Sequence, residues 1–293
     1  MKNKIDRFIR NTFRKKVKAR HAVPTLTLLP LLGCGSDQKI DEIVEEIDEQ
    51  NTSISSDGTN YFDLVASVAN TGSIDATDII TATSDTFISS TSLIDENPYD
   101  RDELTVTATA DIADVPTISG IEIINFTTAA AALGDDLEFD INLLNISGSE
   151  LIYFENTNSS SPVVNLDVTN IGSALSIGSH FSSAKLAAQD DTNLIVTLAS
   201  DMTLTTTGNS QDLTVNASGK SVTLTSSTAT GTTSISNANV VDIDTISGGK
   251  NLIVVANGNV SLDDASQLEG NINIRSGGTI DITNATAALG TLT

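Results

Sequence analysis

Two positions of this 293-residue chain could carry nucleophilic or zinc chemistry. They are Cys34, which is the only cysteine, and His180, which is the only histidine outside the basic N-terminal segment. The sequence has no Cys/His cluster with the spacing of a zinc site, and a Ser-His-Asp triad would depend on His180 alone. We therefore expect no catalytic residue of these classes, and we expect His180 to be solvated near a turn.

Acidic residues are the other candidates for chemistry, because the chain has 38 Asp+Glu against 15 Lys+Arg and a net charge of −23. Their oxygens suit Ca²⁺, which takes about six to eight oxygen ligands. The spacing does not match an EF-hand loop, so the sequence favours a solvated acidic surface and assigns no metal-binding residue. Ca²⁺ stays open as a ligand, and salt adaptation is a second explanation. The clusters are Asp95-Glu96 with Asp100 and Asp102 around Pro98, and three pairs at predicted turns: Asp135-Asp136, Asp190-Asp191 and Asp263-Asp264.

The distribution of charge and aromatic residues argues against two further classes of function. From Cys34 onward the chain has 6 basic and 37 acidic residues, so it repels nucleic acid, and we expect no nucleic-acid partner. Residues 182–293 contain no aromatic side chain on which a sugar could stack. We therefore predict that the protein is not an enzyme. A carbohydrate-active β-helix enzyme, such as a polysaccharide lyase, is the alternative.

The segment that ends at Cys34 has the pattern of an export signal. A run of basic residues precedes an apolar stretch from Ala22 to Leu32, which is too short to span a bilayer as a helix. The stretch ends Leu31-Leu32-Gly33-Cys34 and resembles the bacterial lipobox, which implies cleavage before Cys34 and acylation of its thiol. Gly35 resembles the residue that follows the cysteine in lipoproteins sorted to the outer membrane. We predict a signal peptide over 1–33 and a lipid anchor on Cys34 at the bacterial outer membrane or cell surface; a lone buried cysteine is the alternative.

Residues 34–60 are predicted to form a tether. Ile40, Ile43, Val44 and Ile47 recur at helical spacing among acidic residues. This pattern is typical of a short amphipathic helix, and a solvated charged linker is the alternative.

From residue 194 onward the sequence repeats with a period of about 20 residues. Within each strand-like run, apolar residues alternate with Thr, Ser, Asn or Asp, which indicates one buried and one solvated face. Two sets of runs keep this step throughout. The first set begins at Leu194, Leu213, Thr233, Leu252 and Ile272, and the second at Met202, Val222, Val241, Val260 and Ile280.

A unit of about 20 residues cannot bury its own apolar face, so successive units must stack. The sequence therefore predicts an all-β fold: a parallel β-solenoid (β-helix) with rungs of roughly 20 residues over 104–293. Residues 61–103 are expected to be an irregular cap or an opening rung. A β-sandwich is the alternative, but it would not require a constant step in both sets. Glycines mark the expected corners between rungs: Gly231, Gly248, Gly270 and Gly290.

The rungs before residue 194 are longer and less regular. The phrase Ile118–Phe126 recurs as Ile146–Phe154, and a looser copy runs from Ile171 to Phe181. Stacking these copies predicts an internal column of Phe126, Phe154 and Phe181. It also places Glu122 and Glu150 one above the other as like charges, which is unfavourable without water or a cation. The partner strands of these copies, in a second sheet, are expected to begin at Leu104, Leu137 and Val163.

The last residues of the sequence, Thr291-Leu292-Thr293, fall where a further strand is expected to start. No charged strand, proline or amphipathic helix covers that edge in the sequence, and open edges recruit other strands. We expect either that the chain is a fragment of a longer protein or that this edge self-associates.

The order of phrases over 78–131 resembles Thr/Ala/Asp-rich bacterial S-layer and RTX-associated surface proteins. It is carried by Ile79–Phe87, Leu93–Asp95, Asp102–Thr107 and Ile118–Phe126. The resemblance implies a secreted structural or adhesive role at the cell surface. The Gly-rich nonapeptides that bind Ca²⁺ in RTX repeats are absent, so calcium dependence is only left open. The sequence thus predicts a non-enzymatic surface lipoprotein, as an S-layer-like component, adhesin or spacer. Its expected partners are the membrane, polysaccharide and other surface proteins.

Overall fold

The computed structural model describes residues 53–54, 59–72, 76–97, 100–112, 115–128, 138–157, 164–208, 210–285 and 288–292. By contacts the chain divides into two compact units, residues 1–61 and 62–293. The signal peptide, Cys34 and the tether helix lie outside the described residues and stay predictions. In the first unit, β1 (Ser53–Ile54) pairs antiparallel with the beginning of β2 (Asn60–Asp63).

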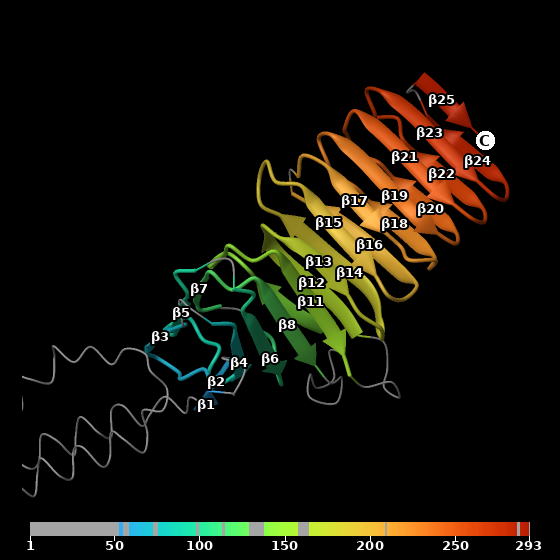
Figure 1. Cartoon of the computed structure of the whole chain (residues 1–293). Coiled ribbons are helices and arrows are strands. Elements are labelled where there is room, and N and C mark those ends of the chain that lie inside the picture. The colour runs from blue at the N-terminus through green and yellow to red at the C-terminus, as the bar shows by residue number, and fades with distance from the viewer. Residues whose placement is uncertain are drawn as a thin grey trace, which may run out of the picture. The chain divides into compact units, whose positions relative to one another are not determined.

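Every described helix or strand element of residues 69–293 is a β-strand, and each pairs in parallel with the strand of a neighbouring rung (Figure 1). The fold is therefore the predicted all-β parallel solenoid. Over the part of the chain that the structure describes, no helix has the length and apolar character needed to cross a membrane.

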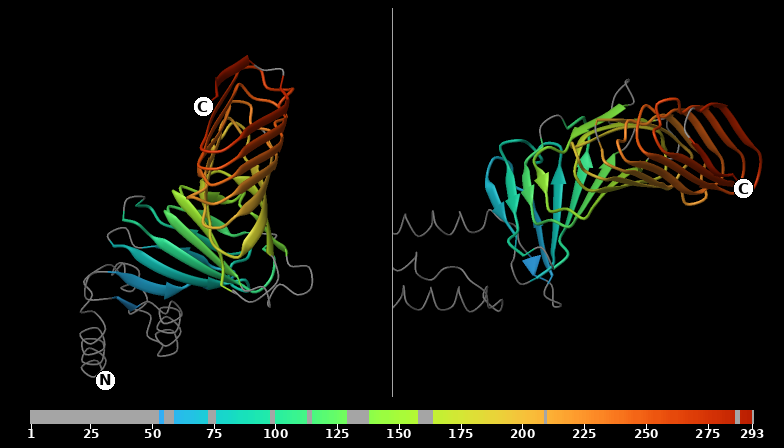
Figure 2. Two further views of the ribbon diagram at one scale, coloured as in Figure 1. Left: turned by 90° about the vertical axis from the view of Figure 1, so that its right-hand side faces the viewer. Right: turned by 90° about the horizontal axis from the view of Figure 1, so that it is seen from above.

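Each C-terminal rung contributes one strand to each of two sheets, which we call sheets A and C. The rungs lie one behind the next along the chain (Figure 2). The strands of sheet A are β15 (Leu194–Leu198), β17 (Leu213–Asn216), β19 (Thr232–Ala238), β21 (Asn251–Ala256), β23 (Asn271–Ser276) and β25 (Ala288–Leu292). The strands of sheet C are β16 (Met202–Thr207), β18 (Val222–Ser226), β20 (Val241–Thr245), β22 (Val260–Asp264) and β24 (Ile280–Asn284).

The predicted column of buried side chains in sheet A is confirmed. Leu194 is in register with Leu213, Thr233 follows in the next rung, and Leu252 and Ile272 complete the column. All five side chains are at most 2% exposed. The hydroxyl of Thr233 interrupts the apolar column, and it is satisfied by the buried hydroxyl of Ser227 at 3.1 Å. The alternation of residue types thus sets both register and core, because a slip by one residue would turn the buried set outward.

In the N-terminal rungs, the chain contributes strands to sheet A and to a different, shorter sheet, which we call sheet B. Sheet A continues back through β13 (Ala174–Ile177), β11 (Leu151–Asn156), β8 (Ile123–Thr128), β6 (Glu103–Ala108) and β4 (Asp78–Thr83). Sheet B consists of β3 (Ala69–Thr71), β5 (Ser92–Ile94), β7 (Thr117–Ser119) and β10 (Ile146–Ser147). Sheet C begins with β9 (Glu138–Asn142), β12 (Val164–Ile171) and β14 (Phe181–Ala188).

The repeat of the Ile118–Phe126 phrase is confirmed, but its third copy does not continue the aromatic column. Phe126 and Phe154 are in register, and their rings stack with centroids 5.3 Å apart and planes at 13°. Phe181 instead begins β14 in sheet C and pairs with Val164. The residue that follows Phe154 in its column is Ile177 of β13. The prediction for Phe181 was wrong because the rung is shorter there, so the chain reaches the next sheet before that residue.

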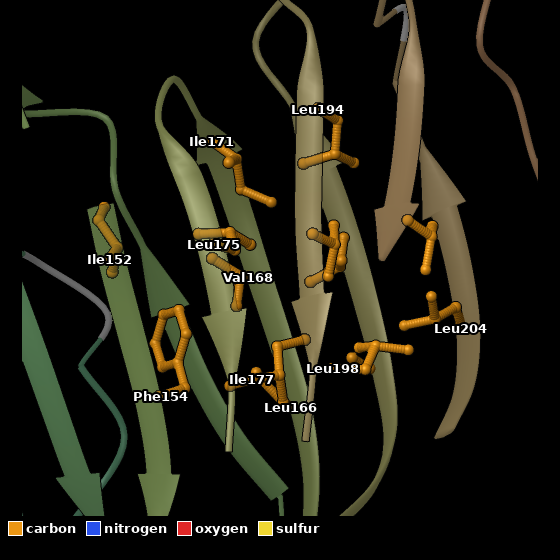
Figure 3. Close-up of a cluster of buried hydrophobic side chains, with 14 of the residues drawn as sticks. Ile152, Phe154, Leu166, Val168, Ile171, Leu175, Ile177, Leu194, Leu198 and Leu204 are labelled. Carbon is orange, nitrogen blue, oxygen red and sulfur yellow. The ribbon is translucent and has the colours of Figure 1, made fainter. Parts of the chain in front are cut away.

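The interior between sheets A and C is filled by aliphatic and aromatic side chains. Figure 3 shows Phe154 of β11, Ile177 of β13 and Leu166 of β12 projecting into this interior. Each of these side chains is at most 1% exposed. Such contacts between sheets, and not only the ladders within them, hold the rungs in place.

Two boundary predictions also need correction. Leu104 lies in β6, which pairs with β8 in sheet A, so it belongs to the same column as Ile124 and not to a partner sheet. Gly290 lies inside β25, which begins at Ala288, so it is not a corner between rungs. Gly231, Gly248 and Gly270 do lie between strands, as predicted. The strands expected at Leu137 and Val163 begin one residue later, at Glu138 and Val164.

Candidate functional site: a buried carboxylate cluster

Four acidic side chains meet at one corner of the N-terminal rungs. Asp78 begins β4, Asp102 directly precedes β6, and Glu122 directly precedes β8. Because these three strands pair in register, the three acids occupy the equivalent position of consecutive rungs. Asp95 reaches the same corner from the end of β5 in sheet B. We call Asp78, Asp95, Asp102 and Glu122 the carboxylate cluster.

The carboxylate cluster is buried. Asp78 and Asp102 are 0% exposed, Glu122 is 3% exposed and Asp95 is 4% exposed. The prediction of a solvated acidic surface was therefore wrong for Asp95 and Asp102. The physical reason is the stacking itself, since each rung shields the corner of the previous one from water.

One oxygen of three of these carboxylates is held by a backbone N–H group. Asn97 donates to Oδ1 of Asp95 at 2.6 Å, and Asp78 donates to Oδ1 of Asp102 at 2.7 Å. The N–H group of Asp102 in turn donates to Oε2 of Glu122, also at 2.7 Å. A ladder of hydrogen bonds thus connects the acid of each rung to the backbone of the rung before it.

The other oxygen of each of these three carboxylates is buried and accepts no hydrogen bond. These atoms are Asp95 Oδ2, Asp102 Oδ2 and Glu122 Oε1. Asp100, which is half-buried beside the cluster, repeats the arrangement: its Oδ2 accepts from Nδ2 of Asn97 at 3.2 Å, and its Oδ1 is buried without a partner. Buried carboxylate oxygens without a donor are costly, because they have lost water and gained nothing in its place.

The electrostatics of the carboxylate cluster reflect this burial. Desolvation raises the pKa of Asp102 to about 8, although the N–H group of Asp78 opposes the shift. Desolvation also raises the pKa of Asp95 to about 6, against the effect of the Asn97 N–H group. The neighbouring carboxylates, including Asp100, add to both shifts by repulsion. Ionisation of both Asp95 and Asp102 at neutral pH is therefore unfavourable unless positive charge is present.

Two glycines make room for Asp95. Gly72, Asp95 and Gly120 each follow a strand of sheet B at the equivalent position of three consecutive rungs. A Cβ atom on Gly72 would lie 2.1 Å from Oδ2 of Asp95, and one on Gly120 would lie 2.2 Å from the backbone oxygen of Asp95. Gly120 also has a φ of +79°. A side chain at Gly72 would therefore displace this carboxylate, and one at Gly120 would overlap the backbone that carries it.

Glu150 occupies the position of Glu122 in the next rung but does not join the cluster. Its backbone N–H group donates to the backbone carbonyl oxygen of Glu122 at 2.9 Å, while its side chain is exposed. The predicted stack of two like charges is thus avoided, because one side chain lies in the interior and the other in solvent.

A second acidic group lies on sheet C and has a different charge balance. Glu138, Asp140 and Asp167 approach one another there. Nζ of Lys185 binds Oδ2 of Asp167 at 2.6 Å, and this hydrogen bond raises the pKa of Lys185. Burial raises the pKa of Asp140. A lysine thus supplies positive charge to this group, whereas the structure describes no ion pair on Asp95, Asp102 or Glu122.

The remaining predicted residues are mostly where the sequence placed them. His180 is exposed in a turn, and Asp190-Asp191 form an exposed turn. Asp263-Asp264 end strand β22 and are not in a turn. Asp135-Asp136 and Cys34 lie outside the described residues.

Sequence reasoning singled out Asp95 and Asp102, and it singled out Glu122 only as a like charge next to Glu150, but it missed Asp78. A signal was available, because an acid directly precedes or begins each of three consecutive sheet A strands. The steps between these acids, 24 and then 20 residues, match the rung length. The local sequence did not show that these acids are buried.

These rungs define a repeat protein of the parallel β-solenoid class. Comparison with known protein families, with curated proteins and with solved structures gives no match to this chain. The resemblance to S-layer and RTX-associated surface proteins therefore stays a prediction.

Proposed function

We propose that this chain is a non-enzymatic structural or adhesive lipoprotein of the bacterial cell surface. Cys34 would carry the lipid anchor, residues 34–60 would form the tether, and the β-solenoid would present its polar face to partners. Polysaccharide, other surface proteins and a second copy of the chain are the partners that such a face suits.

The observation that carries this proposal is a polar column on the outer face of sheet C. Successive rungs place one hydroxyl or carboxylate at the same register position. All of these side chains are exposed or half-buried. Since neighbouring rungs lie about 4.8 Å apart, the column offers regularly spaced hydrogen-bonding groups, which favour a repetitive partner. The column consists of Ser183, Thr203, Thr223, Asp242, Ser261 and Asp281.

The lipid anchor is tested by replacing Cys34 with serine and fractionating cells that express the full chain. We expect the natural chain in the membrane fraction and Cys34→Ser in the soluble fraction, because several acyl chains anchor stably and none can be attached to serine. Ser36→Ala, two residues away, is the matched control and should leave the membrane fraction unchanged. Membrane retention of Cys34→Ser would contradict the proposal.

The non-enzymatic role is tested separately with a panel of polysaccharides. We expect binding without cleavage, measured by co-sedimentation of the protein with insoluble glycans and by chromatography of soluble ones. Turnover of any glycan would overturn this part of the proposal in favour of a carbohydrate-active β-helix enzyme.

A further inference from the structure

We propose that the carboxylate cluster is a Ca²⁺ site that joins successive rungs of the solenoid. This inference goes beyond the surface role and does not depend on it, because it rests only on the corner formed by sheets A and B.

The oxygens form two overlapping groups, each compact enough to bind one hard cation. One ligand oxygen each from Asp78, Asp95 and Asp102 lie within 4.8 Å of one another, and the same is true of Asp100, Asp102 and Glu122. Oxygens bound to one Ca²⁺ lie about 2.3–2.6 Å from the ion, so two of them are at most about 5 Å apart. Asp102 belongs to both groups and is therefore the residue that an ion in either position would share.

The unpartnered oxygens point to a ligand independently of the clustering. Asp95, Asp102 and Glu122 are at most 4% exposed, and each has one oxygen fixed by a backbone N–H group and one oxygen without a donor. A carboxylate held in this way is oriented before an ion arrives, which lowers the entropic cost of binding. These three oxygens are suitable ligands for a cation, and none of them accepts a described hydrogen bond.

The charge balance points the same way. On sheet C, Lys185 pairs with Asp167 and supplies one positive charge to that group, whereas Arg101, which directly precedes Asp102, is exposed. Repulsion among Asp78, Asp95, Asp100 and Asp102 favours any species that brings positive charge into this corner. Carboxylates without nitrogen or sulfur ligands select hard cations over transition metals.

An ion at this place would connect distant segments. The ligands of the two groups, which share Asp102, come from the end of β5, the start of β4 and the residues before β6 and β8, and together they span residues 78–122. Binding to the folded state alone stabilises it by mass action. The site would therefore lock three rungs together through a corner that is otherwise destabilised by its own charge.

The test is thermal unfolding of the full chain, followed by circular dichroism with a chelator and then with increasing free Ca²⁺. At free Ca²⁺ about 100-fold above its Kd, we expect Tm to rise by about 5–10 °C. Asp102→Asn and Glu122→Gln keep the side-chain shape and remove charge, so each should reduce the affinity for Ca²⁺ by about tenfold or more. Asp281→Asn, an exposed acid of β24, is the control and should keep the full shift.

A second readout separates ion binding from a merely structural role of these residues. With the chelator at neutral pH, Asp102→Asn should have a Tm equal to or above that of the natural chain, because it removes a carboxyl group that is unfavourable to bury in this corner without an ion. A natural chain whose Tm does not respond to Ca²⁺ would overturn the proposal. Retention of the full Ca²⁺ shift by both Asp102→Asn and Glu122→Gln, or its loss in Asp281→Asn, would do so as well.

Discussion

Replacement of Phe154 by alanine is expected to lower the free energy of unfolding by about 3–5 kcal/mol. The side chain is 0% exposed, stacks on Phe126 and meets the edge of Phe139 at a centroid distance of 6.4 Å. It therefore joins two rungs of sheet A and also contacts sheet C. Removing the ring leaves a cavity between two sheets whose backbones are fixed by their ladders, so the site can collapse only partly.

The measurement is urea unfolding monitored by circular dichroism. Phe154→Leu fills most of the cavity, so its loss of free energy of unfolding should be less than half that of Phe154→Ala. Ile195→Ala is the matched surface control, because Ile195 lies on sheet A with 45% of its surface exposed and should change stability by less than about 0.5 kcal/mol. Equal losses for Phe154→Ala and Ile195→Ala would contradict the arrangement of the core.

Gly120→Ala is expected to be the second most damaging change, at about 2–5 kcal/mol. A left-handed φ of +79° costs an alanine about 1–2 kcal/mol. The new Cβ would also lie 2.2 Å from the backbone oxygen of Asp95, so a whole rung has to shift. Because that oxygen belongs to the main chain, no side-chain rotation relieves the overlap.

Gly219→Ala separates these two contributions. Gly219 has a similar φ of +82°, but a Cβ there would meet nothing within 4 Å. Gly219→Ala should therefore lower the free energy of unfolding only by the cost of the left-handed backbone conformation, about 1–2 kcal/mol. Urea unfolding of the two variants side by side is the comparison, and equal losses of the free energy of unfolding would mean that Gly120 is not in close contact with the preceding rung.

The C-terminal rungs could be predicted from sequence because two simple periods coincide there. Alternation of period two decides which side chains of β15 to β24 are buried, and the constant step from rung to rung decides which strands are neighbours. Leu194, Leu213, Leu252 and Ile272 therefore fell into one column as expected. Even the polar Thr233 was placed correctly, since register outweighs the character of one side chain.

The N-terminal rungs were harder because their strands are short and the partner sheet changes. Strand β10 has only 2 residues, too few for a visible alternation. Near β9 and β12, the strands that alternate with those of sheet A along the chain change from sheet B to sheet C. No local residue pattern in the sequence indicates this change. Phe181 was misplaced for this reason, although the pairing of Phe126 with Phe154 was predicted correctly.

The carboxylate cluster was only partly visible in the sequence for a related reason. Whether an acid is solvated depends on what covers it, and Asp102 is covered by the rungs that carry Asp78 and Glu122 on either side. Composition argues for a solvated acid at each position taken alone. Only the register of β4, β6 and β8 shows that three acids share one buried corner.

The central claim of stacked, in-register rungs is tested most directly by disulfide cross-linking on sheet A. Thr214 and Ser234 are register partners on adjacent strands, and Ile253 follows Ser234 one rung further. In a Cys34→Ser background, which has no other thiol, Thr214→Cys/Ser234→Cys places the two Cα atoms about 4.8 Å apart, within the range of a disulfide. Thr214→Cys/Ile253→Cys doubles that distance. We predict rapid intramolecular oxidation of the first pair only, measured by thiol titration and mass spectrometry; oxidation of the second pair without the first would contradict the stacked solenoid.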